Sequence, residues 1–149
     1  MACIFCSIAA GEAESYQVYR RHGLMVILDK YPVSRGHLLV IPVEHYEAVQ
    51  DTPPRLLAKA WVAASALAHV YRSRLGARGV KVLTNSGRIA GQVIFHFHIH
   101  VIPYWGDGQL GRGVLTREEA LSVLEMLEPH KDVIEEYLRG AGLVGEDEA

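Results

Sequence analysis

The sequence contains no apolar run long enough to cross a membrane, because the longest run after the N-terminus spans residues 38–43 and includes a proline. It has no cationic excess for wrapping duplex nucleic acid, since 15 basic side chains stand against 17 acidic ones. The first residues lack a charged segment followed by an apolar one, so we expect no signal peptide. These absences favour a cytoplasmic protein whose partners include neither a membrane nor a nucleic acid polymer.

Cysteine is also scarce, with two residues in the whole chain, and both lie near the N-terminus as Cys3-x-x-Cys6. In a cytoplasmic protein this spacing favours metal binding or redox chemistry over a structural disulfide. The redox interpretation lacks the βαβ pattern that usually surrounds such a pair. A pair of buried thiols without metal remains the plain alternative.

The composition predicts one globular domain. Of the 149 residues, 50% are hydrophobic and 21% are charged, which is typical of a folded chain of this length. We expect the domain to span residues 1–139. Residues 140–149 are glycine-rich and then acidic, and we expect them to form a flexible tail.

The hydrophobic periodicity changes along the chain and predicts an α+β fold. Alternating or continuous apolar runs predict strands at 17–20, 24–29, 37–42, 80–85 and 92–103. Three- and four-residue spacing predicts a long helix at 54–75 and shorter helices at 116–128 and 129–139. Strands in runs with separate helical regions indicate one antiparallel sheet with helices packed on it.

Histidine is abundant, with eight residues, and three of them alternate with apolar residues in the longest predicted strand. Because side chains alternate faces along a strand, His96, His98 and His100 share one face, and Phe97 and Ile99 share the other. Imidazole can serve as a nucleophile, an acid or base, a phosphate donor or a metal ligand. The pattern therefore allows either phosphoryl transfer or a metal site on a sheet.

The segment that leads into this strand favours the phosphate interpretation. It runs from Asn85 to Gln92 and contains two glycines, whose backbone N–H groups can approach an anion closely. A catalytic metal would call for a nearby carboxylate, and none stands between Lys81 and Trp105.

These residues resemble the histidine triad family. Its signature alternates three histidines with apolar residues and is matched throughout by residues 96–102. The resemblance extends to residues 29–32 and 36–42, to the Asn–Gly-Gln loop and to the N-terminal cysteine segment. It implies a half-open, five-stranded antiparallel sheet with a long helix and C-terminal helices, assembled as a homodimer.

The resemblance also implies an activity. The family's members are nucleotide hydrolases and transferases that act at an α-phosphate, on nucleoside phosphoramidates or dinucleoside polyphosphates. By that likeness His98 is the nucleophile that forms a covalent nucleotidyl-histidine, and His100 and His37 donate to phosphate oxygens. The remaining substrate-binding residues implied for a purine nucleotide are Asp29 at the ribose, Ile27 at the base, and Asn85, Gly91, Gln92 and Val93 around the phosphate. A nucleotidyl transferase or phosphorylase, and a nucleotide-binding dimer with incidental catalysis, remain as alternatives.

The same resemblance implies that the cysteine pair binds a metal ion. In zinc-bearing histidine triad proteins two cysteines, a downstream histidine and the first triad histidine bind one structural zinc ion. The matching residues are Cys3, Cys6, His45 and His96. Triad membership alone gives His96 a catalytic role, and the cysteine pair shifts our expectation towards zinc binding. His22, His69 and His130 are expected to be solvated surface residues.

Overall fold

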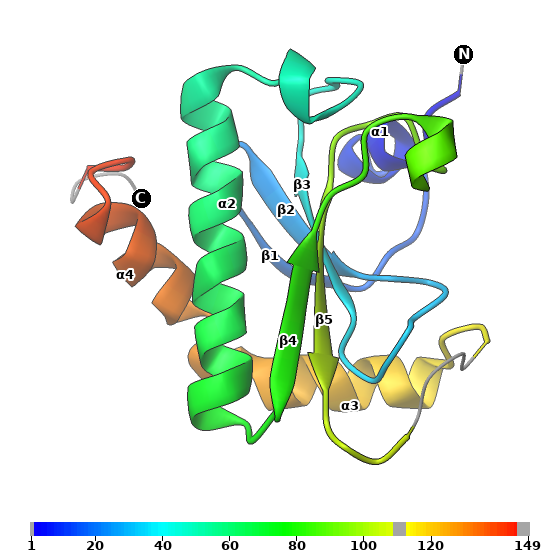
Figure 1. The fold of residues 1–149 in the computed structure, drawn as a ribbon, viewed down its shortest axis with the longest axis vertical. Helices are drawn as coiled ribbons and strands as arrows, with labels where there is room; N and C mark the ends of the chain where they lie inside the picture. Colours follow the sequence, from blue (N-terminus) through cyan, green and yellow to red (C-terminus); the bar gives the residue numbers. More distant parts are fainter. Residues whose placement is uncertain (1, 109–112, 146–149) are drawn as a thin grey trace.

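The computed structural model describes residues 2–108 and 113–145, and its centre is a five-stranded sheet (Figure 1). The strands are β1 (Gln17–Arg21), β2 (Leu24–Leu28), β3 (Leu38–Pro42), β4 (Gly79–Leu83) and β5 (Ile99–Tyr104). Their order across the sheet is β1-β2-β3-β5-β4, and every neighbouring pair is antiparallel. This is the open α+β sheet that the sequence predicts.

The helices fall into three groups around the sheet. The N-terminal helix is α1 (Ile4–Ala9), and the long one is α2 (Pro54–His69), which continues into a π-turn at Val70–Arg74. The C-terminal pair is α3 (Arg117–Leu127) and α4 (Asp132–Gly140), joined through a 3-10 turn at Glu128–His130. Two further 3-10 turns lie at Val49–Asp51 and Arg88–Ala90. The periodicity predicts the long helix and the C-terminal pair, whereas α1 was not predicted.

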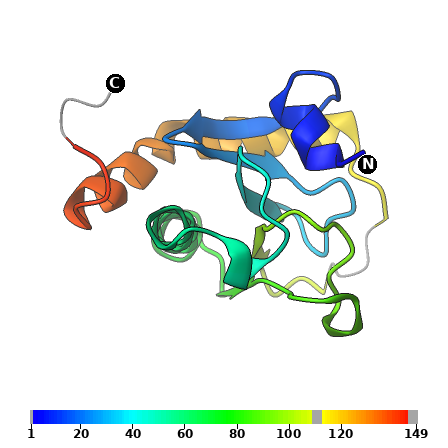
Figure 2. The same cartoon turned by 90° about the horizontal axis from the view of Figure 1, so that it is seen from above.

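The two faces of the sheet are covered by different helices, which explains why β2 and β3 are buried along their whole length. Val26, Val40 and Val101 face one way and pack against α2 in the main core. Met25 and Ile41 face the other way and pack with the apolar side of α1. Figure 2 shows α2 and α1 on opposite sides of the sheet.

The predicted strand at 92–103 is wrong in its first half. Regular pairing begins only at Ile99, and residues 94–96 form a bend. Phe97 still lies in the main core with 1% of its surface exposed. The side chains therefore alternate between the two faces here even though the backbone makes no regular strand pairing. The physical reason is that β3 and β4 pair with β5 no further than Ile99 and His100, and the preceding segment turns towards residues 45–47 instead.

The expectation that His22 is a solvated turn residue is also wrong. His22 and Gly23 both have positive φ, at 57° and 79°, as the tight turn between β1 and β2 requires. The His22 side chain is 4% exposed, and its Nε2 lies 3.0 Å from each carboxylate oxygen of Glu135 in α4. The turn is therefore a docking point for the C-terminal helix.

The carboxylate of Glu135 is contacted by several donor side chains of the β1–β2 hairpin. The Tyr19 hydroxyl donates to it at 2.6 Å, and the guanidinium of Arg21 lies 3.2 Å away. The donors Tyr19 and His22 hold the pKa of Glu135 below its usual value against the opposing effect of burial. This cluster joins α4 to the first hairpin.

The chain beyond Arg139 continues to pack on the fold. The guanidinium of Arg55 in α2 donates to the carbonyl of Leu143 at 2.7 Å, and Val144 is 6% exposed within the main core. The start of the expected flexible tail is therefore packed, and its last four residues lie outside the described ranges. Within those ranges, no helix is long and apolar enough to span a membrane.

We predict that Glu135→Gln lowers the free energy of unfolding by about 1–3 kcal/mol, because it leaves buried donors facing a neutral amide. A carboxylate with a depressed pKa stabilises the fold above its unfolded pKa, and that stabilisation is lost as pH falls through the folded pKa. The gap between variant and wild type should thus close in acid. Urea unfolding at pH 7 and pH 3.5 measures both effects.

The exposed neighbour Glu136 on the same helix supplies the matched control. Glu136→Gln should leave the unfolding midpoint within error of the wild type. Equal effects of the two substitutions would contradict the role given to Glu135.

Candidate active site and metal centre

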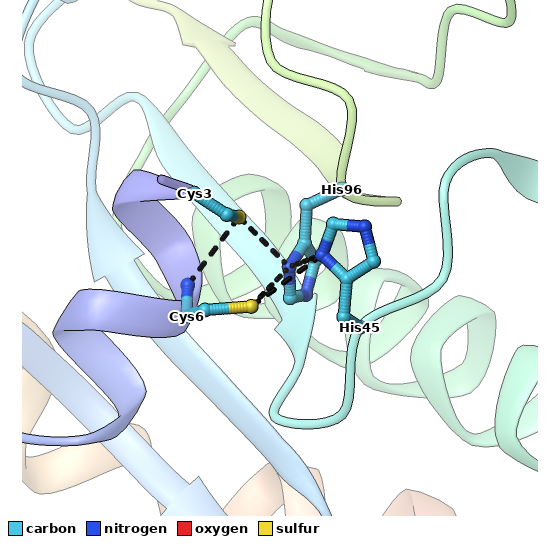
Figure 3. Close-up of side chains that lie close together, drawn as sticks. All are labelled: Cys3, Cys6, His45 and His96. Atoms are coloured by element: carbon cyan, nitrogen blue, oxygen red, sulfur yellow. Dashed lines mark hydrogen bonds between the residues drawn. The ribbon is translucent and has the colours of Figure 1, made fainter. Parts of the chain in front are cut away.

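Two cysteines and two histidines from distant parts of the chain meet beside α1 (Figure 3). Cys3 caps the N-terminus of α1 and Cys6 lies in its first turn, where the Cys6 N–H points at the Cys3 sulfur from 3.5 Å. His45 follows β3, and His96 lies in the segment before β5. One potential ligand atom from each residue lies within 4.8 Å of the others.

The separations of these atoms fit one tetrahedral metal ion. Nδ1 of His96 lies 3.4 Å from the Cys3 sulfur, 3.6 Å from the Cys6 sulfur and 3.1 Å from Nδ1 of His45. Tetrahedral zinc places two bound nitrogens about 3.3 Å apart and a nitrogen and a sulfur about 3.6 Å apart. The cluster could therefore hold a metal, and two thiolates with two imidazoles are a donor set that suits zinc.

The hydrogen bonding of His96 prepares it for this role. Its Nε2 lies 2.7 Å from the carbonyl of Pro42, so Nε2 carries the proton and donates it. Nδ1 is then left with a lone pair aimed at the cluster. The ring is 0% exposed, and burial lowers its pKa, which keeps it neutral. A backbone carbonyl that accepts the other ring N–H in this way is common for histidines that bind metal.

His98 is fixed in the complementary way. Its Nδ1 lies 2.7 Å from the carbonyl of His96, so Nδ1 donates and Nε2 keeps the lone pair. Burial lowers the pKa of His98, although the His96 carbonyl and the charge of Asp29 act in the opposite direction. A neutral imidazole with a directed lone pair is a competent nucleophile or base.

His37 and His100 form a directional hydrogen-bond chain. The backbone N–H of Val33 donates to Nδ1 of His37 at 3.0 Å, which places the His37 proton on Nε2. That Nε2 then donates to Nδ1 of His100 at 2.9 Å. The His100 proton therefore lies on its own Nε2, and this group remains a hydrogen-bond donor. The His98 and His100 rings meet edge to face at 4.9 Å.

Burial dominates the ionisation of this pair. It lowers the pKa of His37 to about 4, and a neighbouring charge on His98 acts in the same direction. It also lowers the pKa of His100 to about 4, with further contributions from His98 and His37. At neutral pH both rings are neutral, so they act through N–H groups and carry no positive charge.

Asp29 lies beside this chain, where β2 and β3 separate. Its backbone N–H donates to the His37 carbonyl at 3.0 Å, and its carboxylate lies 3.4 Å from Nε2 of His37. The other carboxylate oxygen accepts the N–H of Tyr31 at 2.8 Å. Burial raises the pKa of Asp29, and the Tyr31 N–H opposes that shift.

Asp29, His37 and His100 also lie close enough together to suggest a cation site. The hydrogen bonding argues against one, because the Nε2 of His37 that faces the group carries a proton. Moving that proton to Nδ1 would set it against the N–H of Val33. The arrangement suits donation to an anion better than ligation of a metal.

The loop from Asn85 to Gln92 is shaped by its glycines and by Gln92. Gly87 and Gly91 have φ of 94° and 100° and flank the short 3-10 turn. Gln92 is 3% exposed, and its amide accepts from the Gly87 N–H at 2.9 Å and donates to the carbonyls of Glu47 and Ile94 at 2.7 and 3.2 Å. In this structure the side chain of Gln92 braces the loop.

The other predicted substrate residues are spread more widely. The Asn85 amide lies 3.5 Å from the Gly91 carbonyl and keeps the two ends of the loop together. Val93 is 85% exposed at the end of this loop. Ile27 is only 3% exposed and belongs to the apolar cluster that packs against α1. Ile27 pairs with Leu39, and Leu39 pairs with His100, so all three share the face that carries the histidines.

Several supporting residues carry no strong signal in the sequence. Phe5, between the two cysteines, meets the rings of His96 and His98 edge to face at 5.7 and 5.0 Å. Tyr71 in the π-turn donates to the Gly36 carbonyl, immediately before His37. The apolar position within the cysteine motif could have indicated Phe5, whereas nothing in the local sequence marks Tyr71.

A cavity of about 330 Å³ lies elsewhere, between β1 and the start of α4. Its lining includes Arg21 and Glu135, which pair with each other, and none of the predicted site residues. This cavity is therefore separate from the candidate site.

Comparison with known proteins agrees with this geometry. Residues 10–105, more than half of the chain, match the HIT domain family. A hypothetical histidine triad nucleotide-binding protein of Sulfolobus tokodaii superimposes with a TM-score of 0.79 at 36% identity, covering 94% of this chain and 97% of that one. A zinc-bound histidine triad family protein of Mycobacterium smegmatis superimposes with a TM-score of 0.73 at 32% identity, covering 95% and 98%.

A functionally named relative is the adenylylsulfatase HINT3 of Arabidopsis thaliana, which is 35% identical over 128 residues. The match covers 82% of this chain and 65% of that protein. The family match and these relatives establish that the chain belongs to the histidine triad (HIT) family.

We predict that His37 and His100 titrate near pH 4, well below an ordinary histidine. Between that pH and about 6.5 the unfolded chain binds more protons than the folded one, so acid should reduce stability over this interval. NMR titration of the labelled imidazoles reads the midpoints directly. Midpoints between 6 and 7 for both rings would contradict the dominant effect of burial on this pair.

Proposed function

We propose that this protein is a nucleotide hydrolase that cleaves at an α-phosphate through a covalent nucleotidyl-histidine on His98. The observation that carries the proposal is the hydrogen bond from Nδ1 of His98 to the His96 carbonyl, because it leaves the lone pair of Nε2 free to attack. An imidazole fixed in this tautomer needs no base to remove a proton first.

In the first step Nε2 of His98 attacks the α-phosphorus in line, and the bond to the leaving group breaks. The electron pair goes to the leaving group, and a P–N bond replaces the bond that is lost. In the second step water attacks the same phosphorus and releases a proton to the solvent, and the P–N bond breaks to return His98 with its lone pair. Dividing one displacement into two uses the lability of the bond from phosphorus to imidazole.

The phosphate oxygens would be bound by neutral donors. The chain from Val33 through His37 to His100 ends in the Nε2–H of His100, beside the His98 ring. Oriented N–H groups in a half-buried site stabilise developing charge without reorganising. The backbone at Gly91 and Val93, together with Asn85, would complete this cradle.

Asp29 and Ile27 are the residues that we assign to the nucleoside. A carboxylate suits the two hydroxyls of a ribose, and Asp29 is held beside His37 by its backbone. Ile27 belongs to the apolar cluster on the same face and is assigned to the base. Purine nucleoside phosphoramidates and dinucleoside polyphosphates are the substrate classes to test first.

The relatives support this assignment without naming the substrate. One neighbouring structure is described as nucleotide-binding, and HINT3 is named for hydrolysis of an adenylyl compound. HINT3 extends well beyond the matched region, so its activity informs the reaction class alone.

Zinc is proposed as a structural ion held by Cys3, Cys6, His45 and His96. Bound there, it would supply a cross-link between the N-terminus and the segment that carries His98, two residues beyond His96. A site filled by four protein ligands leaves no open position for substrate. His96 therefore acts through its position, and its carbonyl orients the nucleophile.

The quaternary structure and location complete the proposal. β4 lies at one end of the sheet and pairs with β5 on its inner side, so its outer edge is suited to pairing with a second copy in a homodimer. A cytoplasmic location agrees with a site that needs two reduced cysteines.

We predict that His98→Ala lowers the release of AMP from a purine nucleoside phosphoramidate by at least about a thousandfold, since it removes the attacking atom. His69→Ala serves as the control, because His69 lies in α2 against Tyr137. Rapid quenching and intact-protein mass spectrometry should detect a nucleotidyl adduct in wild type and in His69→Ala, and none in His98→Ala. Wild-type turnover by His98→Ala would refute the mechanism.

The same experiment separates the alternatives. Products that appear only with inorganic phosphate or another acceptor would identify a nucleotidyl transferase or phosphorylase. Nucleotide binding without turnover across the substrate panel would identify a binding protein.

We predict that His45→Ala reduces bound zinc from about one equivalent per chain to a small fraction, because it removes one of four ligands. His45 is exposed, so this change opens no cavity in the core. Elemental analysis of the purified protein measures the zinc, with His69→Ala again as the control. Full zinc occupancy in His45→Ala would contradict the assigned ligand set.

A further inference from the structure

His98 lies at the point where regular sheet pairing ends. The last pair between β4 and β5 is Leu83 with His100, and the last pair between β3 and β5 is Val40 with Ile99. His98 precedes both positions, so the sheet ladders of the described residues do not hold its backbone. Other contacts must fix the residue to which we assign the attack on phosphorus.

Thr84 provides such a contact from the end of β4. Its hydroxyl donates to the carbonyl of His98 at 2.7 Å, in the position where the ladder would otherwise continue. On the preceding residue, the N–H of Phe97 donates to the carbonyl of Tyr46 at 2.6 Å. The segment before β5 is thus held from two sides, by the end of β4 and by the loop that carries His45.

The backbone contact controls the ring because the His98 imidazole is tied to its own chain. Its Nδ1 donates to the His96 carbonyl, two residues earlier, so a rotation of the backbone at 96–98 carries the ring with it. Threonine is stiff about its first side-chain torsion, which makes it a firm anchor for the carbonyl. A contact on the His98 carbonyl therefore affects the direction of the Nε2 lone pair.

We propose that Thr84 is a positioning residue for the nucleophile, through its hydrogen bond to the His98 carbonyl. The inference rests on the proposed function of His98 and adds a residue that the triad signature does not contain. Thr84 also precedes Asn85, so the same strand end places the nucleophile and the start of the phosphate loop. A displacement of about 1 Å in the attacking atom can reduce a rate by as much as about a hundredfold.

The test compares Thr84→Val with Thr84→Ser. Valine keeps the volume and removes the hydroxyl, whereas serine keeps the hydroxyl. We expect Thr84→Val to lower kcat by about 10- to 100-fold with KM nearly unchanged, and Thr84→Ser to retain kcat within about threefold. Thr52→Val is the matched control, because it removes a threonine hydroxyl that donates to the Ala48 carbonyl at 3.0 Å.

Single-turnover quenching should locate the loss in the formation of the nucleotidyl adduct, with bound zinc unchanged. Wild-type kcat in Thr84→Val would overturn the proposal, and so would an equal loss in Thr84→Ser. A wild-type protein that forms no adduct with any substrate would instead refute the proposed function.

In that event a second measurement still decides the role of Thr84. Diethyl pyrocarbonate modifies accessible neutral imidazoles, and peptide mapping reports each histidine separately. Thr84→Val should raise the modification rate of His98 several-fold relative to His69, because the ring is less restrained. Identical relative rates in Thr84→Val and wild type would overturn the proposal without reference to turnover.

Discussion

The site depends on one constraint, which is that its imidazoles are oriented by backbone hydrogen bonds of fixed polarity. His96 donates to the Pro42 carbonyl, His98 donates to the His96 carbonyl, and His37 accepts from the Val33 N–H. Each bond decides which ring nitrogen carries the proton and which keeps a lone pair. Three chemically identical side chains thereby present different groups: His96 turns a lone pair towards the two cysteines, His98 keeps a lone pair on Nε2, and His37 donates through Nε2 to His100.

The cluster of two cysteines and two histidines is directly linked to the candidate nucleophile. His96 contributes its ring to the cluster and its carbonyl to His98. Phe5, inside the cysteine motif, packs on the edges of both rings. Residues 92–98 make no regular ladder in the described structure. The cluster, Phe5 and the Thr84 hydroxyl therefore hold this segment in place of strand pairing. A metal ion bound by the four residues of the cluster would add to the same restraint.

The sequence predicts much of this arrangement because its signals are local. Alternation across residues 96–102 separates a histidine face from a core face, and Phe97 and Ile99 are indeed buried. The spacing of the cysteines marks a ligand pair, and the helical periodicity of residues 54–75 matches α2 and its π-turn. The prediction of a solvated His22 is wrong because its partner Glu135 lies more than a hundred residues away, and no local pattern indicates such a contact. The predicted start of the strand at 92–103 is wrong for a similar reason, because the ends of β3 and β4 determine where pairing with β5 stops.

By itself, then, the sequence determines the family, the order of the elements and the residue types that carry the chemistry. These follow from periodicity and motif spacing, which neighbouring residues specify among themselves. The tertiary structure alone decides the tautomers of the histidines and the lowered pKa values of His37 and His100. It also decides which backbone groups the side chains of Gln92 and Thr84 bind. Some of these features depend on partners far apart in the chain, as His96 does on Pro42 and His100 on His37. Others, such as the hydrogen bond from His98 to the His96 carbonyl, join near neighbours in a segment whose conformation is held by contacts with distant residues. In both cases only the folded arrangement fixes the donor, the acceptor or the buried environment.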